Sequence, residues 1–184
     1  MEDLLRGENW FPSVETRAFI ARENRFVQRR FADFLHLKPG LAVFVIRQLA
    51  ADYNMVGKME EMIAAAGFEI LRSAPIPENL RDIVMARFRG GNWALPTGAG
   101  LPIHYVVAFD RNPQAVDPKL FVDAIATDNG RLFLKRRIRE KAAAIAGTSS
   151  FNALHSSDNS CAALEYIEIL CPGLYAKCAA LVQK

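Results

Sequence analysis

The chain has 184 residues, of which 51% are hydrophobic, which is enough for one well-packed domain but too few for two full domains. Its formal charge of +3 suits an anionic ligand but falls short of the clustered excess typical of a dedicated nucleic-acid binder. No apolar run approaches the roughly 18 residues that cross a bilayer, and the three cysteines lack the spacing of a disulfide framework or zinc site. We therefore expect a cytoplasmic protein without a membrane segment.

Residues 1–40 are aromatic and basic, and we expect an N-terminal helical extension there. Phe19 and Phe26 are seven residues apart, and Phe31 and Phe34 fall near the same helical face, which predicts one or two amphipathic helices. Interleaved arginines and aromatics also occur in segments that bind nucleic acid. Packing of the apolar face on the main domain or on a second subunit is the commoner explanation, so we consider nucleic acid an unlikely partner.

Residues 41–184 are expected to form the main domain. The apolar run 41–47 is typical of a buried strand, and Gly67 has the position of a residue that ends a helix. The alternation of elements predicts an α+β sandwich, with a four-stranded antiparallel, ferredoxin-like sheet covered by helices. The expected elements are strands over 41–47, 68–72 and 102–110, and helices over 56–66, from Pro77 or Glu78 onward, over 117–126 and over 174–182.

The segment 130–144 carries a cluster of positive charge with Glu140 as its single acid. Like charges at i,i+3 and i,i+4 repel one another on a helix, and a bound anion relieves that repulsion. A polyphosphate site needs such a cluster, because phosphoryl transfer develops charge that the protein must neutralise. A basic surface helix is the alternative interpretation. The cations are Arg131, Lys135, Arg136, Arg137, Arg139 and Lys141.

The segment 151–172 is where we expect the chemistry. His155 precedes Ser156, Ser157 and Asp158, whose oxygens suit the cap of a following helix. Unpaired N–H groups at a helix N-terminus favour phosphate, so the histidine is predicted to lie beside a phosphate site. A nucleophilic histidine also needs a group that fixes its other ring nitrogen. The candidates for that role are Glu165 and, one turn later, Glu168.

At these residues the chain resembles the nucleoside diphosphate kinases, whose phosphorylated histidine lies in the pattern Asn-x-x-His-Gly-Ser-Asp. Asn152, His155, Ser157 and Asp158 match this pattern, and Ser156 stands where the family has glycine. Glu165 is followed by Pro172 at the family's interval. The resemblance covers roughly Leu41 to the C-terminus.

Two further matches concern phosphate contacts. Arg47 stands ten residues before Gly57, where the family has a lysine at the same interval. Arginine keeps the charge but differs from lysine in reach and geometry. The pair Gly130-Arg131 resembles a Gly-Arg pair whose arginine contacts phosphate, and we assign the family's second arginine to Arg139 in preference to Arg136.

The resemblance implies a kinase that works through a phosphohistidine. His155 would take the γ-phosphate of ATP or another nucleoside triphosphate and pass it to a nucleoside diphosphate. Mg²⁺ would bridge the nucleotide phosphates, with few or no protein ligands, and a homo-oligomer is expected. In this scheme Glu165 orients the ring, Ser157 supports Glu165, Asn152 holds a ribose or phosphate oxygen, Phe88 or Trp93 covers the base, and Arg47, Arg131 and Arg139 neutralise phosphate charge.

Two other hypotheses remain open at this point. The first is a diverged, weakly active or inactive module of the same fold that binds a nucleotide or a protein partner, since the family's lysine and glycine are both replaced. Such a module would gain thermal stability from nucleotide but form no phosphoenzyme. The second is a nucleic-acid binder, which would bind with a steep salt dependence.

Overall fold

The computed structural model describes residues 37–88, 93, 100–116, 127–148 and 152–184. The helices expected within residues 1–36 and over 117–126 lie outside the described residues. No helix in the described ranges has the length and apolar character needed to cross a bilayer.

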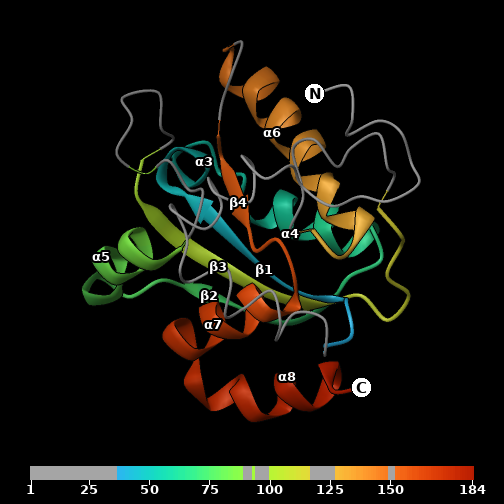
Figure 1. Cartoon of the computed structure of the whole chain (residues 1–184). Coiled ribbons are helices and arrows are strands. Elements are labelled where there is room, and N and C mark those ends of the chain that lie inside the picture. The colour runs from blue at the N-terminus through green and yellow to red at the C-terminus, as the bar shows by residue number, and fades with distance from the viewer. Residues whose placement is uncertain (1–36, 89–92, 94–99, 117–126, 149–151) are drawn as a thin grey trace, which may run out of the picture.

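Four strands form one antiparallel sheet in the order β2-β3-β1-β4 (Figure 1). The strands are β1 (Leu41–Arg47), β2 (Glu69–Pro75), β3 (Pro102–Phe109) and β4 (Leu154–Ser156). All seven residues of β1 are buried, because neighbouring strands flank it and helices cover both of its faces. The predicted α+β fold with a four-stranded antiparallel sheet is confirmed.

One face of the sheet is covered by α3 (Gln48–Asp52), α4 (Val56–Ala65) and α6 (Leu134–Ala146), the last of which continues a 3-10 turn, η3 (Gly130–Phe133). Alternate β1 residues such as Phe44 and Ile46 point into this layer, as the two-residue period of a strand requires. Phe44 packs edge-on against Phe68 with ring centroids 5.4 Å apart. The α4 helix ends before Gly67, whose φ of +100° disfavours any side chain, as the sequence predicted.

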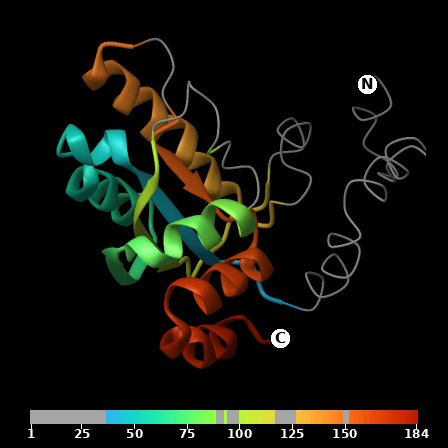
Figure 2. The same ribbon diagram turned by 90° about the vertical axis from the view of Figure 1, so that its left-hand side faces the viewer.

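The opposite face is covered by α5 (Glu78–Arg87), α7 (Ser160–Leu170) and α8 (Tyr175–Val182), with the turn η4 (Pro172–Leu174) joining the last two (Figure 2). The other set of β1 residues, including Val43 and Val45, packs here. The two helical layers therefore enclose two separate apolar cores with the sheet between them.

The sequence placed three strands and left the fourth without a position. The structure locates β4 at Leu154–Ser156, so His155 lies on a strand and not in the loop that precedes a helix. The following helix, α7, begins only at Ser160 and is capped by Asn159, whose side chain accepts from Ala162 N. The expectation that Ser156, Ser157 and Asp158 cap this helix directly after the histidine is therefore wrong.

Candidate active site

His155 occupies the middle of β4, opposite Val45 of β1. Its neighbour Leu154 points into the α4 and α6 layer, so the imidazole points to the other face, toward α7. The side chain is buried, with a relative exposure of 5%. The histidine is thus held by the sheet, on the face that α5 and α7 cover.

The ring contacts two aromatic side chains on this face. Its Nε2 lies 3.2 Å from the hydroxyl of Tyr166 on α7. Tyr166 is stacked on Phe88, with ring centroids 3.7 Å apart and an interplanar angle of 3°. Trp93 meets the imidazole edge-on at 5.6 Å between centroids. The tyrosine is fixed by stacking, so its hydroxyl holds the imidazole in one orientation.

Three cations lie near enough to the same histidine to influence its pKa. Burial is the largest cause that lowers the pKa of His155, to about 3, and nearby positive charges act in the same direction. The imidazole is therefore neutral at physiological pH, and one of its nitrogens carries a lone pair. The cations are, in order of effect, Lys135, Arg139 and Arg47.

Arg47 reaches the site from the end of β1 and is fully buried. Its Nε donates to the carbonyl oxygen of Gly100 at 2.9 Å, and its guanidinium carbon lies 4.9 Å from the centroid of the Trp93 ring. Burial, and then the charge of Arg139, lowers the pKa of Arg47. Arg47 and Arg139 are therefore close enough for the positive charge of one to disfavour that of the other.

Lys135 and Arg139 both come from α6, four residues apart and hence on one helical face. Arg139 Nε donates to the carbonyl oxygen of Leu154 at 2.8 Å, beside the histidine. Lys135 Nζ lies 3.5 Å from Asp158 Oδ1. Burial is the main cause that lowers the pKa of each cation. Placing partly desolvated cations around a neutral histidine creates a site that favours an anion.

The N-terminus of α7 does not provide the predicted phosphate site. Ser160 N donates to Asp128 Oδ2 at 3.0 Å, and Ala162 N donates to Asn159 Oδ1 at 2.8 Å. Burial raises the pKa of Asp128 to about 6. Two side chains of this protein therefore already accept from the first turn of α7.

Ser157 and Ser156 have separate environments. Ser157 N donates to Val43 O at 2.9 Å and its hydroxyl accepts from Val43 N at 3.0 Å, so this residue extends the pairing of β4 with β1. Ser156 is buried, and within the described residues its hydroxyl has no hydrogen-bond partner. It lies on a strand, and Asn54 is the one non-glycine residue with positive φ in the described ranges. Serine therefore replaces the family's glycine here without backbone strain.

Glu165 and Asn152 complete the set of residues predicted near the histidine. Glu165 is half-buried on α7, and the next residue, Tyr166, supplies the group that this helix places against Nε2. The orienting role of Glu165 and its support by Ser157 stay predictions. Asn152 is half-buried, and its Oδ1 has no hydrogen-bond partner in the described part of the chain. An acceptor in that state suits a hydroxyl donor such as a ribose.

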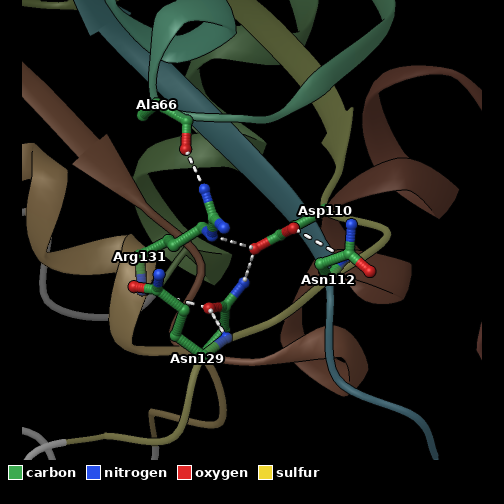
Figure 3. A network of polar contacts seen from close by, with 6 residues as sticks. Ala66, Asp110, Asn112, Asn129 and Arg131 are labelled. Carbon is green, nitrogen blue, oxygen red and sulfur yellow. Dashed lines mark hydrogen bonds and ion pairs between the residues drawn. The ribbon is translucent and has the colours of Figure 1, made fainter.

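Arg131 is not at this site, contrary to the prediction. Its Nε is 3.1 Å from Asp110 Oδ2 and its Nη1 donates to Ala66 O at 2.6 Å (Figure 3). Asp110 follows the Phe109 end of the β1-β3 ladder, whereas Arg47 lies at the other end. Arg131 therefore joins the end of α4 to the end of β3, and it does not lie with Arg47, Lys135 and Arg139.

Asn129 completes this second network. Its Nδ2 donates to Asp110 Oδ2 at 2.9 Å, and its Oδ1 accepts from Arg131 N and Gln114 N (Figure 3). Asp110 Oδ1 also accepts from Asn112 N. The buried carboxylate is thus satisfied by groups that fix the turn before α6.

The sequence interpretation did not identify Tyr166, and it named Lys135 only as one member of the basic cluster without a role at the histidine. Lys135 precedes Arg139 by four residues, so helical spacing alone places it on the same face. Tyr166 belongs to the apolar spacing of α7, where Ala163, Ile167 and Leu170 are also buried. Helical spacing therefore indicated Lys135, and the apolar pattern of α7 indicated Tyr166.

Phe88 and Trp93 were the two candidates to cover a nucleotide base. Phe88 is buried in its stack with Tyr166, whereas Trp93 lies over Arg47 and against His155. Trp93 is therefore the better placed of the two.

No group of three histidine, cysteine or acidic side chains within the described residues is placed to hold a metal ion. Comparison of the whole chain with known protein families and with curated proteins gave no match.

Proposed function

We propose that the protein is a phosphotransferase that moves the γ-phosphate of a nucleoside triphosphate to a nucleoside diphosphate through a phosphohistidine at His155. The observation that carries the proposal is the buried, neutral imidazole, which contacts a tyrosine hydroxyl and has Arg139 bound to the carbonyl oxygen of the preceding residue, Leu154. The resemblance of the segment 152–158 to the nucleoside diphosphate kinases supports the same assignment. The fold alone does not carry it, because one fold serves many activities.

The contact with Tyr166 occupies Nε2, so we assign Nδ1 as the reactive nitrogen. When Nε2–H donates to the tyrosine oxygen, the lone pair of the imidazole lies on Nδ1. Nδ1 attacks the γ-phosphorus, the bond from phosphorus to the bridging oxygen breaks, and the nucleoside diphosphate leaves with the electron pair. An oxygen of a second nucleoside diphosphate then attacks the phosphohistidine and restores the neutral ring.

The three cations are assigned to the negatively charged phosphate groups of this reaction. Phosphoryl transfer places negative charge on the equatorial oxygens and on the leaving oxygen, and positioned cations stabilise it. The same charges that lower the pKa of His155 would attract a phosphate to it. Lys135, Arg139 and Arg47 therefore keep the imidazole neutral and bind the transferred group.

The remaining contacts are assigned to the nucleotide. Trp93 supplies a ring face near Arg47 for the base, and Asn152 supplies an acceptor for a ribose hydroxyl. Mg²⁺ enters as part of the nucleotide substrate and bridges its phosphates, as the resemblance implies. Arg47 takes the place of the family's lysine, so its planar guanidinium is assigned to phosphate oxygens.

The test is phosphoenzyme formation. Purified protein is incubated with Mg²⁺ and γ-labelled ATP, and acid-labile, base-stable label is measured on wild type, His155→Ala and His104→Gln. We expect label on wild type and on His104→Gln, a loss of about 1,000-fold or more in His155→Ala, and discharge of the label by a nucleoside diphosphate.

Absence of label on folded wild type that binds ADP would overturn the proposal, and a nucleotide-binding module would then account for the site. Label that persists in His155→Ala would place the phosphorylated residue elsewhere. Far-ultraviolet circular dichroism and thermal unfolding establish that each variant is folded.

A further inference from the structure

A pocket of about 450 Å³ lies on the side of α6 away from the His155 site. It is formed by the end of α4, the segment after β3, and the turn that leads into α6. The size falls within the range of roughly 300–1,000 Å³ typical of small-molecule sites. The lining residues on which the argument depends are Ala66, Gln114, Arg131, Phe133, Arg136 and Arg137.

Helical spacing separates this pocket from the His155 site. Lys135 and Arg139 contact Asp158 and the carbonyl oxygen of Leu154, as described above. Phe133, Arg136 and Arg137 are spaced by three and four residues and line the pocket instead. Lys135 and Arg139 therefore lie on one face of α6, and Arg136 and Arg137 lie on another.

The wall of the pocket is rigid. Arg131 is tied to Asp110 and to the carbonyl oxygen of Ala66 (Figure 3). Gly130 N donates to Gln114 O at 2.8 Å. A side chain at Gly130 would collide with the carbonyl oxygen of Ala115, so the turn is closely packed. Preorganisation of this kind lowers the entropy cost of binding.

The charge of the lining is positive. Three of the lining residues are arginines, and among the described residues that form the pocket there is no aspartate or glutamate. Arg131 is largely compensated by Asp110, whereas Arg136 and Arg137 are exposed neighbours on the helix. Arginine forks match phosphate oxygens in pairs, and a bound phosphate would offset the repulsion between these two side chains.

The pocket also has an apolar part. The guanidinium carbon of Arg136 lies 5.1 Å from the centroid of the Phe133 ring, and Ala66 and Leu134 lie alongside. An apolar or planar group could therefore pack in the pocket while a phosphate remained at the arginines. We propose that this pocket binds a phosphorylated small molecule of nucleotide size, at a site separate from His155.

The test is calorimetric titration of the full chain with ADP, comparing wild type with Arg137→Glu and with the matched charge reversal Lys141→Glu, which lies on α6 outside the pocket. We expect Arg137→Glu to bind one ADP fewer per chain, or to bind it about tenfold or more weakly. Lys141 lies four residues after Arg137 on α6, so a glutamate there can pair with Arg137, and Lys141→Glu is expected to bind ADP at least about twofold more weakly than wild type but more tightly than Arg137→Glu. Equal stoichiometry and affinity in wild type and Arg137→Glu would overturn the proposal.

Two further measurements make the result specific. ADP binding that depends on Arg137 should persist in His155→Ala. This measurement therefore tests the pocket separately from phosphoryl transfer at His155. Inorganic pyrophosphate should bind the same site more weakly than ADP, and Phe133→Leu should weaken ADP more than pyrophosphate. If pyrophosphate binds as tightly as ADP, the apolar part makes no contribution and the proposed ligand class is wrong.

Discussion

Two histidines on one sheet have opposite electrostatic surroundings. His104 on β3 has its Nε2 2.7 Å from Ser73 Oγ and 3.2 Å from Glu60 Oε1. Burial lowers its pKa, and the charge and hydrogen bond of Glu60 oppose that change. His155 is buried as well, but its charged neighbours are cations that lower its pKa further. The sign of the neighbouring charge distinguishes the two sites.

This difference bears on chemistry. Ser73, His104 and Glu60 include the residue types of a hydrolase triad, yet the serine and the glutamate both contact Nε2. In a triad the acid and the nucleophile occupy opposite ring nitrogens, so this cluster lacks the relay geometry. His155 has one nitrogen held by Tyr166 and a cationic environment for an anionic substrate, which is why it is our candidate nucleophile.

The largest effect is expected when His155 is given the acidic neighbour that His104 has. Lys135→Glu should raise the pKa of His155 and repel phosphate, lowering phosphoenzyme formation by about 100-fold or more. Ring resonances followed by NMR across pH report the pKa, and γ-labelled ATP reports the transfer. Lys141→Glu is the control on the same helix. Equal label on the two variants would contradict the assigned role of Lys135.

A second comparison uses acid stability. In the folded state the pKa of His155 is about 3, whereas in the unfolded chain it is near 6.5. The contribution of this residue to the free energy of unfolding is therefore fully present above about pH 6.5 and is lost as the pH falls toward 3. Between pH 7 and pH 5, wild type should lose about 2 kcal/mol of unfolding free energy relative to His155→Gln. Urea unfolding at both pH values measures the difference.

The raised pKa of Asp128 changes stability with pH in the opposite direction to that of His155. Folding favours the protonated carboxyl group, so the free energy of unfolding falls as the pH rises toward 6. This contribution is present in both proteins and cancels in the difference. His104→Gln should change the pH dependence less than His155→Gln, because Glu60 opposes the burial of His104. A larger change in the pH dependence of stability for His104→Gln than for His155→Gln would contradict this ranking of the two histidines.

The smallest effect concerns the serines beside the two histidines. Ser156→Ala removes a buried hydroxyl that lacks a partner in the described residues and should stabilise the fold by about 1 kcal/mol. Ser73→Ala removes a hydroxyl that contacts Glu60 and His104 and should be neutral or destabilise by up to about 1 kcal/mol. Thermal or urea unfolding measures both, and destabilisation by Ser156→Ala would show that its hydroxyl is satisfied.

The fold was largely predictable because its long elements carry clear periodicity. The run 41–46 is apolar throughout and belongs to the buried central strand, and Gly67 ends α4 with a positive φ. By contrast, β4 has three residues, which is too short for any period to be seen. Its pairing with β1 is a long-range contact that local sequence does not encode.

The site was only partly predictable. The family match named His155 and Arg139, which lie close together, but it also placed Arg131 among the phosphate ligands, whereas Asp110 and Asn129 hold Arg131 elsewhere. On α7 the motif named Glu165, whose orienting role stays a prediction, and gave no indication of Tyr166, which contacts the ring. Adjacent helical residues differ in direction by about 100°, so a shift of one position changes which side chain faces the sheet.

The shortness of β4 has a consequence for the stability of different parts of the chain. Only three residues pair this edge strand with β1, and Ser157 adds one further link through its hydroxyl and amide. Local opening that releases β4 breaks far fewer hydrogen bonds than separating β1 from β3, so it costs less free energy than global unfolding. The amide protons of the strand that bears the buried histidine should therefore exchange with solvent before those that join β1 to β3.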